Sequence, residues 1–213
     1  MDSRIKEAVR YLGYGRHAVD EKTGELVRDS FRELDEIAKG RLIYRIFELE
    51  VLDDSRVSLG ELEIISKVLA KNMRGCERAV MLGATLGIEV DMLLRRYSFT
   101  DMSKAVVLQA CAAAVLEEYV DGWQREYEEE AGREGYYFRP RFSPGYGDFD
   151  IFHQKDFIRL LDSAKKIGLT MTDGYMLTPA KSVTAVIGMS KEKVPCHRKG
   201  CEECRKTDCL YRR

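Results

Sequence analysis

The sequence has no long apolar run, almost no net charge and nothing that resembles a secretion signal. No apolar stretch approaches the roughly 18 residues that a membrane-spanning helix needs. Lys and Arg number 35 against 36 Asp and Glu, so the formal net charge of −1 gives no expectation of nucleic-acid or acidic-membrane binding. The start of the chain is charged and amphipathic rather than apolar. We therefore expect a cytoplasmic protein whose partners are neither membranes nor nucleic acids.

Hydrolytic and nucleotide-binding motifs are also missing. The three histidines, His17, His153 and His197, are isolated, and neither H-E-x-x-H nor G-x-S-x-G occurs. Hydrolase chemistry is therefore not expected. No glycine-rich turn follows a first strand, which argues against a conventional doubly wound methyltransferase.

The 213 residues are enough for one sizeable core, and helical and strand-like patterns are mixed along the chain. Apolar spacing predicts helices over 3–12, 25–38, 58–72, 88–96, 101–130 and 153–166. Apolar, strand-like runs predict strands over 41–51, 77–86, 135–139, 169–176 and 182–189. The helix over 58–72 rests on Ser58 as N-cap with Glu61 three residues later. This mixture predicts an α+β fold.

The longest predicted helix changes character along its length. Its first half is small and apolar, with four alanines between positions 110 and 114, so another backbone or a ligand can approach closely. Between Glu117 and Glu134 there are eight acidic residues and two arginines. Most of that run is typical of a solvated helix end. Cys76 and Cys111 lie in apolar context and are expected to be core residues.

A turn-rich loop, R-F-S-P-G-Y, runs from Arg141 to Tyr146. Pro144 fixes its own φ and Gly145 tolerates positive φ, so the pair predicts a tight turn. Such a turn can place the Arg141 guanidinium and the Tyr146 hydroxyl on one side of the backbone, where the guanidinium would bind a carboxylate. An ordinary surface turn with a solvated arginine is the alternative that these six residues leave open.

The loop and a second motif, in order, resemble one family. After the R-x-x-x-G-Y spacing and a short helix, Met171 through Thr184 matches without a gap a family pattern of roughly L-T-E-S-[FY]-x-M-x-P-x-x-S-V-S. Together they resemble the S-adenosylmethionine-binding activation (reactivation) domain of cobalamin-dependent methionine synthase. The similarity extends over about Val106 to Gly188.

The resemblance implies a fold and a set of site residues. The fold would be a single C-shaped α+β domain over residues 1–190, with a central twisted, largely antiparallel sheet and helices packed around it. Arg141, Gly145 and Tyr146 would bind S-adenosylmethionine, with Tyr146 pointing toward the corrin as the catalytic residue. Glu117 would accept the ligand's α-ammonium group. Glu118 and Asp121, which lie within about one helical turn of it, are the alternatives.

The same resemblance implies a role in a methyltransferase system for methionine biosynthesis. The chain would support reductive methylation of cob(II)alamin carried by a separate methionine synthase or related corrinoid protein, because it has no D-x-H-x-x-G cobalamin loop of its own. The electron would come from a flavodoxin-like or ferredoxin-like donor. Whether the chain is itself an enzyme, and which corrinoid protein it meets, the sequence leaves open.

A cysteine-rich tail over 191–213 departs from that family. Its four thiols are spaced C-x4-C-x2-C-x4-C at Cys196, Cys201, Cys204 and Cys209. Tetrahedral zinc, an iron–sulfur cluster and no metal all remain open, because four thiolates suit either metal and the first three cysteines have the plant-type ferredoxin spacing. The family instead continues with an aromatic pair at the ligand site, which has no counterpart here.

The tail also supports a function of another class. It carries eight Lys and Arg against four Asp and Glu, whereas the rest of the chain is acidic. A non-catalytic adaptor, with a zinc-stabilised basic tail that docks a partner protein, would need no small ligand.

Overall fold

The computed structural model describes residues 3–14 and 19–193, which form two compact units. Of the described residues, the first unit contains those up to Gly40 and Leu86–Asp121, and the second contains Arg41–Thr85 and those from Gly122 to Lys193. The tail predicted over 191–213 lies almost wholly outside the described residues, so the predicted division at residue 190 stays a prediction. None of the helices in 3–14 and 19–193 is long and apolar enough to cross a membrane.

The first unit is helical. It comprises α1 (Ser3–Tyr11), α2 (Glu21–Ile37), α4 (Ile88–Thr100) and the first two-thirds of α5 (Met102–Arg133). Asp101 caps α5 by accepting a hydrogen bond from the Lys104 backbone N–H at 3.0 Å. The alanine-rich stretch of α5 is buried, and the Cys111 thiol lies 3.8 Å from the Val27 carbonyl oxygen of α2. Small side chains therefore let α5 pack closely, as the sequence predicted.

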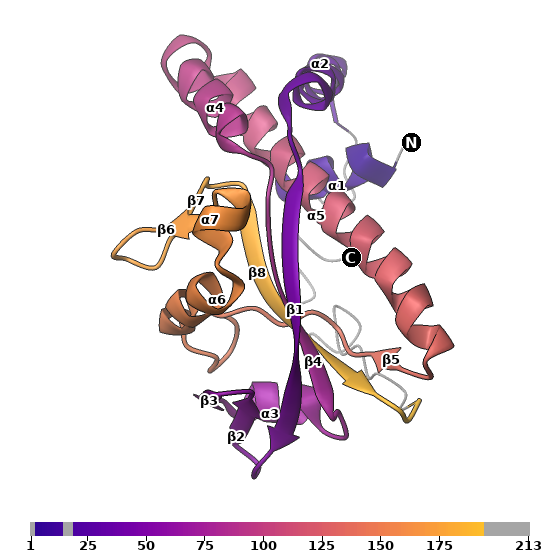
Figure 1. The fold of residues 1–213 in the computed structure, drawn as a ribbon. Coiled ribbons are helices and arrows are strands. Elements are labelled where there is room, and N and C mark those ends of the chain that lie inside the picture. The colour runs from indigo at the N-terminus through magenta and orange to yellow at the C-terminus, as the bar shows by residue number, and fades with distance from the viewer. Residues whose placement is uncertain (1–2, 15–18, 194–213) are drawn as a thin grey trace. The chain divides into compact units, whose positions relative to one another are not determined.

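The second unit is built on a six-stranded sheet with the order β3-β2-β1-β4-β8-β5. The strands are β1 (Arg41–Val51), β2 (Arg56–Leu59), β3 (Leu62–Ile65), β4 (Arg78–Thr85), β5 (Tyr137–Phe138) and β8 (Ser182–Ser190). Every neighbouring pair is antiparallel, and β1, β4 and β8 run side by side along its centre (Figure 1). A separate two-stranded hairpin joins β6 (Thr170–Met171) to β7 (Leu177–Thr178). These findings confirm the α+β fold with a central antiparallel sheet.

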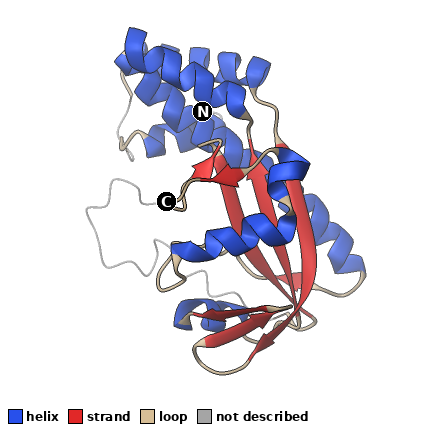
Figure 2. Ribbon diagram, turned by 60° about the vertical axis from the view of Figure 1, so that its left-hand side comes forward, coloured by secondary structure: helices blue, strands red, loops and turns tan. Residues whose placement is uncertain are grey.

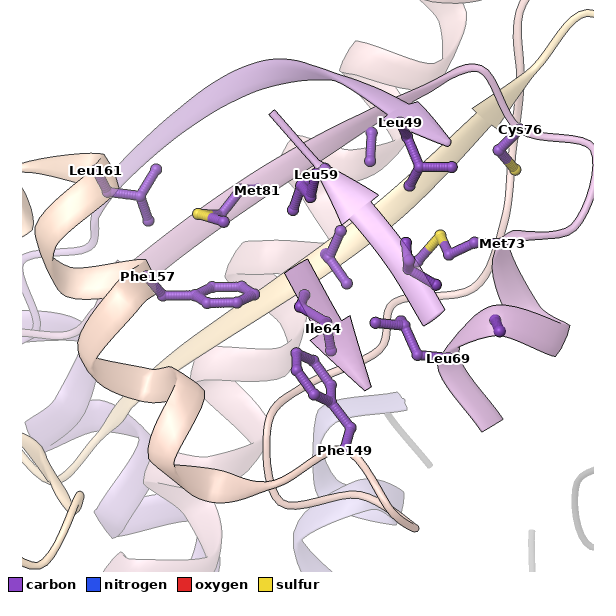
Figure 3. Close-up of a cluster of buried hydrophobic side chains, with 14 residues drawn as sticks. Leu49, Leu59, Ile64, Leu69, Met73, Cys76, Met81, Phe149, Phe157 and Leu161 are labelled. Carbon is purple, nitrogen blue, oxygen red and sulfur yellow. The ribbon is translucent and has the colours of Figure 1, made fainter. Parts of the chain in front are cut away.

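One face of the sheet carries the core of this unit. The helices α6 (Gln154–Leu161) and α7 (Ser163–Ile167) contact β4 and β1, and the short α3 (Lys67–Met73) contacts β2 (Figure 2). Fourteen buried side chains form the cluster, among them Phe149, Phe157 and Met81 (Figure 3). Figure 3 shows Phe149 and Phe157 projecting into the same apolar interior.

The predicted helix over 58–72 is wrong in its first half. Residues 56–65 form the β2–β3 hairpin, which turns at Gly60 with φ +58°, and only Lys67–Met73 is helical. Val57, Leu59 and Ile64 are buried while their neighbours are exposed or half-buried, which is the period of two of a strand. The capping residue is Ser66, which accepts from the Leu69 N–H at 3.0 Å, and not Ser58.

Two other predicted elements are interrupted. The helix over 153–166 begins as a 3-10 turn, η1 (Ile151–His153), and is divided into α6 and α7 by Asp162, whose φ is +49°. The strand over 169–176 is instead the β6–β7 hairpin, and its turn places Tyr175 at φ +61°. The hydrogen bond from the Tyr175 N–H to the Thr172 carbonyl at 2.9 Å closes that turn.

Candidate functional site

The segment that carries Arg141 is tied to the edge of the sheet on both sides. The Arg139 N–H donates to the Gly188 carbonyl at 2.8 Å. Phe142 forms an isolated bridge with Val186, in which each N–H donates to the other's carbonyl at 2.9 and 2.8 Å. Arg141 therefore stands on extended backbone that β8 holds before and after it.

The Arg141 side chain lies against α5. Its Nη1 donates to Oε1 of Gln124 at 2.8 Å, and the side chain is half-buried. Both residues belong to the second unit. A guanidinium is planar, always charged and carries five donors, which suits it to binding a carboxylate. The sequence predicted the chemistry of this residue but not its neighbour.

The turn after Arg141 has the predicted form. The Tyr146 N–H donates to the Ser143 carbonyl at 3.2 Å. Gly145 takes φ +94°, a backbone conformation that residues other than glycine rarely adopt. Tyr146 is 65% exposed, and its ring lies 6.2 Å from that of Phe142. The ring of Tyr146 thus lies beside Phe142, while the Arg141 guanidinium lies beside Gln124.

The end of the loop is anchored by a carboxylate and a phenyl ring. Asp148 accepts from the Ser66 hydroxyl at 2.5 Å and from the N–H groups of Lys67 and Val68 at 2.8 and 3.1 Å, which caps α3 from outside its own chain segment. The Ser66 hydrogen bond is the main reason that the pKa of Asp148 is lowered, with the two backbone donors adding to it. Phe149 is fully buried. The loop is therefore fixed at both ends.

An aromatic cluster lies on α5 beside Gln124. We define it as Tyr44 of β1, Trp123 and Tyr127 of α5, and Phe138 of β5, all in the second unit. Trp123 and Tyr127 are stacked with centroids 5.3 Å apart, and Tyr44 is tilted at 50° to both, at 5.0 and 4.9 Å. Phe138 lies 5.7 Å from Tyr127. Burial is the main cause of the raised pKa of Tyr127.

The acidic candidates lie on the part of α5 that belongs to the first unit. Glu117 is half-buried. Glu118 is in an ion pair with Arg4 at 2.7 Å, and Arg4 also binds Asp35 at 2.9 Å. Glu118 therefore has a structural partner in Arg4. The role of Glu117 toward a ligand stays a prediction.

The second motif forms the β6–β7 hairpin and the start of β8. Thr172 and Asp173 are exposed in the hairpin turn, and the Ser182 hydroxyl donates to the Pro179 carbonyl at 2.6 Å. The buried Thr184 hydroxyl is hydrogen-bonded to Gln154 Oε1 of α6. In this region the polar groups join α6 and the hairpin to the sheet.

The four predicted metal ligands, Cys196, Cys201, Cys204 and Cys209, lie outside the described residues. Within 3–14 and 19–193, no group of three or more His, Cys, Asp or Glu side chains is placed to hold a metal ion. Cys76 and Cys111 are buried, as expected, and burial raises the pKa of the Cys111 thiol to about 12.

Sequence reasoning missed Gln124, the anchoring role of Asp148 and the aromatic cluster. The Gly147-Asp148 pair was visible only as a turn signal, and its partners at the start of α3 are about 80 residues away in the sequence. Trp123, Gln124 and Tyr127 occupy one side of a helix, since residues one, three and four apart span about 100° of its circumference. That spacing was the one available signal.

Comparison with known proteins gives a match to a solved structure but none to a protein family. No protein-family model and no curated protein sequence matches the chain. The chain is similar to a solved structure described as the crystal structure of the MetH reactivation domain bound to AdoHcy, with a TM-score of 0.61. The two sequences are 16% identical, and the match covers 81% of this chain and 67% of that one. At this identity the likeness shows the fold.

Proposed function

We propose that this protein binds S-adenosylmethionine and supports the reductive methylation of cob(II)alamin on a separate corrinoid protein, a methionine synthase or a related methyltransferase. The observation that carries the proposal is Arg141, half-buried and held between two attachments to β8 in a fold similar to the MetH reactivation domain. The neighbour was solved with AdoHcy, which is what S-adenosylmethionine becomes when its methyl group leaves. The similarity therefore favours a ligand of that chemical class.

The residues of this chain fit the amino-acid end of such a ligand. Arg141, whose guanidinium is held beside Gln124, would bind the carboxylate. Positive φ at Gly145 lets the backbone turn back beside the site, and the exposed Tyr146 would face the corrin of the partner. The protein's contribution would be to hold the methyl group in line with the cobalt, since proximity and orientation supply most of the rate gain.

The reaction balances with one external electron. A flavodoxin-like or ferredoxin-like donor reduces cob(II)alamin to cob(I)alamin. The cobalt then takes the methyl group as the carbon–sulfur bond breaks, and the electron pair of that bond stays on sulfur to give S-adenosylhomocysteine. This proposal assigns no cobalamin-binding role to the described residues, because the partner protein carries the corrinoid.

Isothermal titration of S-adenosylmethionine into the anaerobically purified protein tests the binding step. We expect saturable binding that Arg141→Ala weakens at least about tenfold, because a hydrogen bond to a charged group contributes about 1.5–3 kcal/mol. Arg125→Ala is the matched control, since Arg125 is an exposed arginine of α5 next to Gln124. Binding that is absent, or that Arg141→Ala leaves unchanged, would contradict the proposal.

A further inference from the structure

The aromatic cluster of Tyr44, Trp123, Tyr127 and Phe138 consists of large rings that are only partly buried. Tyr44 is 38% exposed, and the neighbouring Ile46 on the same face of β1 is 47% exposed. Trp123, Tyr127 and Phe138 are half-buried. Large aromatic side chains that remain partly open to solvent on a sheet face form a surface that a ligand can cover.

The rings of the cluster are oriented so that their faces point in two different directions. Trp123 and Tyr127 are nearly parallel, with an interplanar angle of 17°, while Tyr44 is inclined at 50° to each. The faces of aromatic rings carry negative charge and attract cations, and tryptophan is the most effective. Rings that meet at an angle can contact one cation from two sides, which is how aromatic cages bind alkylated cations.

The surrounding charge also favours a cation. Glu126 and Glu128–Glu130 are exposed on the same stretch of α5. After burial and Tyr44, the negative charges of Glu130 and Glu134 contribute to the raised pKa of Tyr127, so their field reaches the cluster. The carboxylates of α5 therefore contribute negative charge at the aromatic rings.

The cluster is adjacent to the residue that would bind a carboxylate. Gln124, which accepts from Arg141 at 2.8 Å, follows Trp123 directly and is three residues from Tyr127 on the helix. Residues three apart on a helix are surface neighbours at about 5–6 Å between Cβ atoms. In S-adenosylmethionine only a short aliphatic chain separates the carboxylate from the positively charged sulfonium.

We propose that the aromatic cluster is the subsite for the sulfonium of S-adenosylmethionine, with Tyr44, Trp123 and Tyr127 contacting the cation while Arg141 binds the carboxylate. This inference rests on the proposed function and extends it, because it explains how the site would distinguish the methylated substrate from its product. S-Adenosylmethionine carries the positive charge on sulfur, and S-adenosylhomocysteine, a neutral thioether, does not. The subsite would thus favour binding of the substrate and release of the product.

The single tryptophan of the chain lies in the proposed subsite and supplies the readout. Titration with S-adenosylmethionine should change the fluorescence of Trp123, and S-adenosylhomocysteine should bind more weakly. Replacing the Tyr44 ring in Tyr44→Leu should reduce that preference by about threefold to thirtyfold, the range that corresponds to one cation–π contact. Tyr44→Phe should retain most of it because the ring face remains. Tyr137→Leu is the control, since Tyr137 is a comparably exposed tyrosine, at 43%, outside the cluster.

The outcomes separate this inference from the function on which it rests. Calorimetric binding that depends on Arg141, with no change in Trp123 fluorescence and no loss of preference in Tyr44→Leu, would overturn the sulfonium subsite and leave the proposed function intact. Loss of preference in Tyr137→Leu to the same extent as in Tyr44→Leu would also overturn it. No calorimetric binding of S-adenosylmethionine at all would overturn both.

Discussion

Phe149 is the residue whose removal should most directly loosen the loop that carries Arg141. Its side chain is fully buried, and its ring lies 6.2 Å from Phe142, 6.2 Å from Phe157 and 5.5 Å from His153. Phe149→Ala removes this burial and leaves a cavity, which costs about 3–5 kcal/mol at a well-packed site. For a chain of this size that loss corresponds to a fall in the melting temperature of about 6–20 °C.

Phe152 supplies the matched control. It lies three residues further along and is 36% exposed, so Phe152→Ala should lower the free energy of unfolding by about 1 kcal/mol or less. Urea unfolding followed by Trp123 fluorescence is the assay, because Trp123 and Phe149 belong to the same compact unit. Equal losses for the two alanine variants would refute the conclusion that Phe149 anchors the loop in the core.

Three further predictions test the packing and the electrostatics. Gly188→Ala should lower the melting temperature of the protein, because a Cβ at that position would lie 2.7 Å from the sulfur atoms of Cys76 and Met73; an unchanged melting temperature would contradict this packing. Asp148→Asn should destabilise the protein at neutral pH, and the difference from wild type should shrink as the pH falls below about 4. The sign follows from the lowered pKa of Asp148 in the folded protein. The stabilisation by the carboxylate is complete above the pKa of the unfolded state and is lost as the pH falls through the pKa of the folded state. In a pH series of urea unfolding, a difference between variant and wild type that grows on acidification would contradict this. Alkylation of Cys111, followed by mass spectrometry of the peptide that contains it, should be far slower in the native than in the unfolded protein, because the thiol is buried and its pKa is about 12; equal rates would contradict that burial.

Much of the fold followed from local patterns. Strand β1 was predicted with its observed bounds, because Arg41–Val51 is rich in the β-branched and aromatic residues that favour strands. The long helix was predicted from its small apolar half and its cap at Asp101. The turn at Gly145 followed from the backbone preferences of Pro144 and of glycine.

The misassigned segments had local signals that suited two structures. Ser58 and Glu61 fit a capping box, yet Gly60 between them turns the chain into a hairpin, and the apolar residues on either side alternate in strands of only four residues. Four residues are too few to distinguish a period of two from a period of 3.6. In the folded protein β2 pairs with β1 and β3 pairs with β2. These tertiary contacts outweigh the local helical signal of the segment.

The candidate site could be predicted only as a set of residue types. Arg141, Gly145 and Tyr146 are adjacent in the sequence, so their motif was visible. The partner of Arg141 on α5, the three donors to Asp148 and the meeting of Tyr44 with Trp123 depend on contacts between distant segments. No periodicity encodes such contacts, because they arise from the packing of one element against another.

We propose that this chain delivers the methyl group of S-adenosylmethionine to cobalt on another protein. The most direct measurement mixes the anaerobic full chain with a cob(II)alamin-loaded corrinoid protein, S-adenosylmethionine and a one-electron reductant, and follows the visible spectrum of the corrinoid. We predict methylcobalamin formation that requires this chain and is lost in Arg141→Ala but not in Arg125→Ala. Methylation at the same rate without the chain, or with Arg141→Ala, would contradict the account.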